Sequence, residues 1–137
     1  MNGNKFYDID LPFGEIFEKQ LRYIFGNKRF EVKTEREIWK RTGNICIELE
    51  YQGRDSGLNI TKADYWCHIF QDDGEIQFII IFPVQELRKK VYNLIKQGIA
   101  KLEYGGDNNE SLIALIPRNA IMDTHPPIST GTQKRSE

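Results

Sequence analysis

The sequence predicts an α+β domain in which a mixed β-sheet is flanked by helices. Residues 12–25 and 83–97 repeat apolar side chains at the spacing of an amphipathic helix. The segments between and after them alternate apolar and polar residues with a period of two, as strands do. Because the order is helix, strands, helix, strands, we expect a central sheet with a helix on each side.

The first helix begins at Pro12, since proline is tolerated in the first turn of a helix. Gly26 and Asn27 end it, because both residue types are common just after the last helical turn. Its apolar stripe consists of Phe13, Ile16, Phe17, Leu21, Ile24 and Phe25. Glu15 and Glu18 lie beside this stripe, so both are expected near the packed side of the helix.

Two strands follow, at residues 29–35 and 44–52, and the loop 36–43 joins them. One face of the first strand carries Glu31, Lys33 and Glu35, and one face of the second carries Cys46, Glu48 and Glu50. We expect the two strands to pair as an antiparallel hairpin, which would gather four carboxylates and one ammonium group. Like charges across strands destabilise a sheet by up to about 1 kcal/mol. Such a patch is tolerated when a cation binds it.

The rest of the chain continues the same pattern. After an irregular stretch at 53–60, the run A-D-Y-W-C-H-I-F predicts a strand, and Asp72-Asp73-Gly74 predicts a hairpin turn. Residues 75–82 are apolar on both faces, as in a central, doubly covered strand. A second helix starts at Pro83 and ends before Gly98, and a last hairpin joins 100–104 to 110–116.

Composition indicates one folded domain, residues 1–122, and a polar, disordered tail at 123–137. With 137 residues, 39% hydrophobic content and a net charge of −1, the chain has no global basic signature of nucleic-acid binding. Cys46 and Cys67 lie in apolar strand runs, so we expect buried free thiols in a reducing cytosol. The longest apolar run, 78–84, is too short to span a bilayer. We therefore expect a soluble, cytoplasmic protein.

Acidic side chains on neighbouring strands favour a hard divalent cation. Mg²⁺ or Mn²⁺ takes oxygen ligands and is commonly held by a few carboxylates together with a substrate phosphate. Such an ion activates water for attack on phosphorus, and a nearby lysine offsets the charge that develops. A solvated acidic face with no ligand is the alternative, because E-x-K patterns are common on exposed strands.

A family resemblance supports the metal-binding interpretation. The stretches F-G-E-I-F-E, F-E-V-K-T-E, T-G-N-I-C-I-E-L-E and S-G-L-N-I-T-K-A-D-Y-W resemble the PD-(D/E)XK nuclease superfamily. They are most similar to small phage-type or bacterial members in which T-G-N-x-x-I-E is followed by S-G and A-D-Y-W. The resemblance covers about residues 13–70. It implies a restriction-endonuclease-like core and a metal-dependent DNA endonuclease of the restriction or repair type, with Mg²⁺ or Mn²⁺ as cofactor.

Two alignments of the family motif remain open. The first takes Glu35 as the first acid and Glu48-Leu49-Glu50 as the (D/E)-x-K run, with Lys33 or Lys62 supplying the positive charge. The second takes Glu31-Val32-Lys33 as the E-x-K run and Glu48 as the partner acid. The first alignment preserves the strand order of the superfamily, and both alignments assign Glu48 to the site. The resemblance also implies that Glu18, or alternatively Glu15, reaches the metal from the first helix and that Asp64 is a further candidate.

The DNA backbone would need a local basic surface. Residues 19–41 carry eight basic against three acidic side chains, and Arg29, Arg36, Lys40 and Arg41 are the candidates for phosphate contacts. Trp39 in the same loop is a candidate for stacking on a base. A catalytically inactive nucleic-acid-binding accessory protein with the same fold is the competing interpretation. Self-association as a homodimer is compatible with either one.

Overall fold

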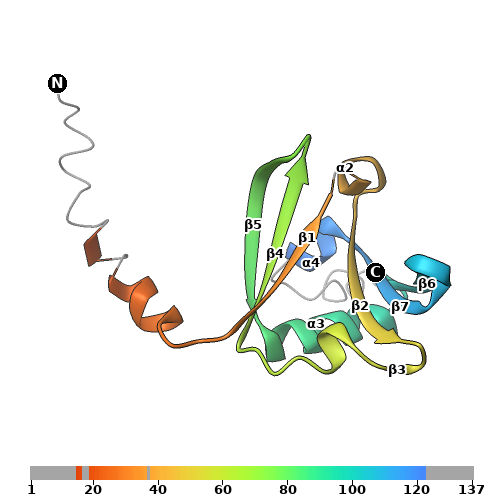
Figure 1. Cartoon of the computed structure of the whole chain (residues 1–137), viewed down its shortest axis with the longest axis horizontal. Coiled ribbons are helices and arrows are strands. Elements are labelled where there is room, and N and C mark those ends of the chain that lie inside the picture. The colour runs from red at the N-terminus through yellow and green to blue at the C-terminus, as the bar shows by residue number, and fades with distance from the viewer. Residues whose placement is uncertain (1–14, 17–18, 37, 123–137) are drawn as a thin grey trace, which may run out of the picture.

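The computed structural model describes residues 15–16, 19–36 and 38–122, and it has a mixed α+β architecture (Figure 1). Residues 15–16 and 19–25 are helical, as expected for that part of the first helix. The elements that follow are β1 (Phe30–Glu35), α2 (Ile38–Thr42), β2 (Asn44–Tyr51), β3 (Arg54–Asp55), β4 (Tyr65–Asp72), β5 (Glu75–Pro83), α3 (Val84–Lys96), β6 (Lys101–Gly105), β7 (Ser111–Pro117) and α4 (Arg118–Met122). Short 3₁₀ turns occur at Gly57–Asn59 and Asp107–Asn109. The tail predicted at 123–137 and Glu18 lie outside the described residues.

The strands form two sheets, not the one central sheet that the sequence predicts. The first sheet has the order β1-β4-β5 and is mixed, because β1 runs parallel to β4 and β4 runs antiparallel to β5. The second sheet has the order β3-β2-β7-β6 and is antiparallel throughout. The predicted hairpin between β1 and β2 is therefore wrong. The short helix α2 lies between them and carries the chain from one sheet to the other (Figure 1).

The position of β5 also differs from the prediction. Its three consecutive isoleucines predict a central strand, but β5 is an edge strand. Phe78, Ile80 and Phe82 pack against the core, whereas Ile79 and Ile81 on the other face are exposed. An apolar run can thus be covered on one side only, which periodicity does not reveal.

The second predicted helix, α3, is confirmed and closes the core beneath both sheets (Figure 1). Its buried stripe consists of Val84, Leu87, Val91 and Leu94. From its polar side, Arg88 donates to the backbone oxygens of Leu58 (2.8 Å) and Thr61 (2.7 Å). The helix therefore also anchors the irregular segment 56–61, whose Ser56 and Thr61 hydroxyls donate to Glu48 and Glu31.

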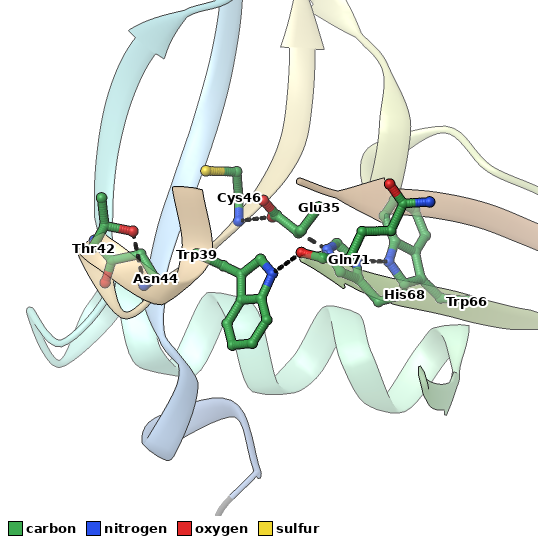
Figure 2. A network of polar contacts seen from close by, with 8 residues as sticks. All are labelled: Glu35, Trp39, Thr42, Asn44, Cys46, Trp66, His68 and Gln71. Atoms are coloured by element: carbon green, nitrogen blue, oxygen red, sulfur yellow. Dashed lines mark hydrogen bonds and ion pairs between the residues drawn. The ribbon is translucent and has the colours of Figure 1, made fainter. Parts of the chain in front are cut away.

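Trp39 belongs to the core and is not available to stack on a base. Its indole N–H donates to the Gln71 backbone oxygen at 2.6 Å (Figure 2), and its ring meets Phe70 and Phe78 edge-on. The Arg118 guanidinium of α4 lies 5.0 Å from the centroid of the Trp39 ring. The apolar surface of Trp39 is thus used to pack α2 onto the first sheet.

Within the part of the chain that the structure describes, no helix is long and apolar enough to cross a membrane. The two cysteines are free, but their predicted burial is wrong, because Cys46 is exposed and Cys67 is only partly buried. Both lie on strands, at positions where the alternating pattern turns the side chain away from the core.

Candidate functional site

A cavity of about 230 Å³ lies where the two sheets meet. It is lined by Lys33, Thr34 and Glu35 of β1, Cys46 and Glu48 of β2, and Trp66 and His68 of β4. The parallel register sets Lys33 opposite His68 and Glu31 opposite Trp66, so these side chains share one face of the first sheet. Of the predicted carboxylate-rich faces, Lys33 and Glu35 of β1 and Cys46 and Glu48 of β2 line this cavity, across two sheets and without a hairpin.

Glu35 is a buried carboxylate, with only 7% of the residue exposed. Its Oε2 accepts the Cys46 backbone N–H at 2.5 Å and faces His68 Nε2 at 3.2 Å (Figure 2). A buried carboxylate without partners would be strongly disfavoured, so these two donors explain how the fold accommodates it. They also connect β1 to β2 and β4 at a single oxygen.

Glu48 is held by two hydroxyl groups. Its Oε2 accepts the Ser56 hydroxyl at 2.5 Å, and its Oε1 accepts the Ser111 hydroxyl at 2.8 Å. Ser56 precedes the 3₁₀ turn at Gly57–Asn59, and Ser111 begins β7. Both oxygens of Glu48 are therefore oriented by neighbouring elements before any ligand is bound.

Lys33 brings a positive charge to the cavity. Its Nζ lies 3.1 Å from Glu31 Oε2 and 5.9 Å from the centroid of the Trp66 ring. Glu31 also accepts the Thr61 hydroxyl at 2.8 Å. The Thr61 hydrogen bond, and after it the contact with Lys33, lowers the pKa of Glu31 below its ordinary value, against the opposing effect of partial burial. Glu31 is thus a stable anionic partner that fixes Lys33 at the cavity edge.

The thiol of Cys46 is not activated, although it lines the cavity. Desolvation on its packed side, followed by the nearby carboxylates Glu35 and Glu103, raises the pKa of Cys46 to about 11. The thiolate is the reactive form of cysteine, so Cys46 is a poor nucleophile at neutral pH. Cys46 is therefore not a candidate nucleophile among the side chains that line the cavity.

This pKa predicts slow alkylation of Cys46. In a Cys67→Ser background, the iodoacetamide rate at pH 8 should be about 100-fold below that of an ordinary thiol and should keep rising past pH 10. Glu35→Gln should accelerate it, because that change removes one of the two carboxylates that oppose ionisation. Mass spectrometry across pH 7–10.5 measures the rate, and a plateau near pH 9 would contradict the assignment.

Gly57 lets the segment 56–61 approach β2. Its φ is +50°, and a Cβ placed there would lie 2.2 Å from the Glu48 backbone oxygen. Gly53 has a similar φ of +77° but faces open space, so it is a matched control. We expect Gly53→Ala to lower the unfolding free energy by about 1 kcal/mol, from the left-handed backbone alone. Gly57→Ala should lower it by about 2–4 kcal/mol, because steric overlap adds to that strain. Urea denaturation measures both, and equal losses would refute the close approach.

The other predicted site residues lie outside the cavity lining. Glu50 follows a β-bulge on β2 and pairs with Asp55 of β3. Lys62 is exposed, and Glu15 is exposed on the first helix. Asp64 accepts the Arg29 backbone N–H at 2.9 Å and joins the start of β1 to that of β4. The cavity thus contains Glu35 from the first motif alignment, together with Lys33 and Glu48, which occur in both alignments.

The basic candidates for DNA contact remain on the surface. Arg29 lies 3.9 Å from Asp64, and Lys40 forms an ion pair with Asp72 at 2.7 Å. Arg36 and Arg41 are exposed at the end of β1 and in α2, next to the cavity-lining end of β1. Of these four basic residues, Arg36 directly follows the cavity-lining Glu35 in the chain.

Sequence reasoning missed His68, Ser56 and Ser111 as parts of the site. The apolar strand around His68 predicts a core residue, and its burial is confirmed at 2% exposure. Its spacing of two from Trp66 places both on one strand face, but only the parallel pairing of β1 with β4 brings that face to Glu35. The roles of Ser56 and Ser111 were not predictable from the sequence. Ser111 lies far from Glu48 along the chain, and a turn separates Ser56 from Glu48.

Two carboxylates are available to a cation in this cavity. Among the described residues, no three His, Cys, Asp or Glu side chains gather into a group that could hold a metal by themselves. Mg²⁺ often uses only one or two protein carboxylates and completes its shell with water and substrate phosphate. The hard oxygen donors of Glu35 and Glu48 suit such an ion. Comparison with protein-family models, with curated proteins and with solved structures finds no match for this chain.

Proposed function

We propose that this chain is a Mg²⁺- or Mn²⁺-dependent phosphodiesterase that cleaves DNA, with a core of the PD-(D/E)XK type. The observation that carries the proposal is the meeting of Glu35, Glu48 and Lys33 around one cavity, from strands of two different sheets. Metal-assisted phosphodiester hydrolysis can use such a set, with the two carboxylates holding the cation and the lysine offsetting the charge on the phosphate.

Each residue then has a separate role. Glu48, with both oxygens oriented by serine hydroxyls, and Glu35, fixed through one oxygen, bind the cation. The cation, when bound, polarises the phosphate and lowers the pKa of a coordinated water. Lys33 stands at the cavity edge, where its ammonium group can contact a phosphate oxygen and offset the charge that develops on it.

The cavity, of about 230 Å³, has room for a cation and a phosphate group. The rest of a nucleic acid would lie outside, across the surface that carries Arg36 and Arg41. Such a surface contacts the backbone and gives binding that weakens with salt.

Incubation with supercoiled plasmid, single-stranded DNA and branched DNA, each with Mg²⁺, Mn²⁺ or EDTA, tests the proposal. Cleavage that requires the divalent cation is the expected result. Binding of DNA without cleavage would favour the inactive accessory protein instead. Neither binding nor cleavage would identify the acidic face as a solvated surface.

A further inference from the structure

Three side chains form a buried chain of hydrogen bonds that ends at the cavity. Trp66 Nε1 donates to His68 Nδ1 at 3.0 Å, and His68 Nε2 lies 3.2 Å from Glu35 Oε2 (Figure 2). Trp66 and His68 are 1% and 2% exposed, so water does not compete for these bonds. All three residues also line the cavity of the candidate site.

The indole fixes the tautomer of the imidazole. An indole N–H can only donate, so His68 Nδ1 must be the acceptor and carry no proton. The proton of the neutral ring is then on Nε2, and this N–H donates a hydrogen bond to the Glu35 carboxylate. The hydrogen bonds are therefore donated in one direction, from Trp66 to His68 and from His68 to Glu35.

Both donors to Glu35 meet the same oxygen. Oε2 receives the Cys46 backbone N–H as well as His68, whereas Oε1 has no hydrogen bond among the described residues. We propose that His68, oriented by Trp66, is a positioning residue that ties down Oε2 of Glu35 and so leaves Oε1 to ligate a divalent cation in the cavity. This inference rests on the proposed function for the identity of the ligand, and it assigns residues that the motif patterns did not include.

Hydrogen bonds of this kind behind a ligand orient it, and their removal typically weakens metal binding about 10–100-fold. His68→Phe keeps the ring shape but loses the donor. His68→Gln keeps an amide N–H for Glu35 and an amide oxygen for Trp66. Trp66→Phe keeps an aromatic ring in the core, but it removes the indole N–H and so releases the tautomer of His68.

The test measures Mn²⁺ affinity by calorimetry on the full chain, for these variants and for Glu35→Gln, with thermal melts to verify folding. His68→Phe should weaken Mn²⁺ binding about 10–100-fold, His68→Gln should restore most of it, and Trp66→Phe should fall between. In the Glu35→Gln background, His68→Phe should cause no further loss, because its effect passes through Glu35.

Unchanged Mn²⁺ affinity in folded His68→Phe would overturn the inference, as would an equal loss in the Glu35→Gln background or no Mn²⁺ binding by the wild type. If His68→Phe does not fold, the comparison of Trp66→Phe with wild type decides in the same way. Plasmid cleavage is measured separately. A wild type that binds Mn²⁺ through this chain of residues but leaves DNA intact would refute the nuclease function and retain the positioning role.

Discussion

Glu48→Gln should abolish cation-dependent DNA cleavage, with a loss of at least about 100-fold, the scale of removing one well-placed electrostatic group. Glu48 is the acid on which both motif alignments agree, and both of its oxygens are oriented by serine hydroxyls at the cavity. The amide has the same shape but no charge and one acceptor oxygen, so it is a poor ligand for a hard cation.

The matched control is Glu75→Gln, which removes an exposed carboxylate at the start of β5. It should cleave DNA like the wild type. Glu48→Gln should lose some stability as well, since one of Ser56 and Ser111 would no longer have an acceptor, at a cost of about 1–3 kcal/mol. Cleavage is therefore measured well below the melting temperature of the variant. Wild-type cleavage by folded Glu48→Gln would show that the cavity is not the active site.

Lys33→Met should reduce cleavage about 100–1,000-fold while leaving Mn²⁺ affinity nearly unchanged. Lys33 contacts Glu31 and lies over Trp66, so its ammonium group is held at the cavity edge without contacting either proposed cation ligand. Methionine keeps most of the length and the apolar packing, so the change isolates the charge.

Lys62→Met decides between the two lysines that the sequence offered. Lys62 is exposed and does not line the cavity, so its variant should cleave at the wild-type rate. Single-turnover cleavage and calorimetry are run on both variants. Loss of activity in Lys62→Met but not in Lys33→Met would show that Lys62, and not Lys33, supplies the positive charge at the phosphate.

The secondary structure was largely predictable because periodicity and turn residues act locally. The positions of β2, α3 and the hairpin of β6 and β7 follow from alternation, a helical stripe and glycine-containing turns. The same reasoning correctly placed Glu31, Lys33 and Glu35 on one face of β1. A local signal of this kind depends on the strand itself and not on its partner.

Strand pairing was not predictable, because it depends on contacts between distant segments. The loop 36–43 is long enough for a hairpin, but α2 within it packs Trp39 into the core and redirects the chain. β1 then pairs in parallel with β4, a connection that no turn motif marks. His68 became part of the site only through this pairing, which explains why its role was missed.

The most direct measurement is the location of Mn²⁺ by anomalous X-ray scattering from crystals grown with the ion. We predict a peak inside the cavity, about 2.1 Å from a Glu48 carboxylate oxygen and from Oε1 of Glu35. A peak only at exposed carboxylates such as Asp107, or no peak at all, would contradict the assignment of this cavity as a divalent-cation site.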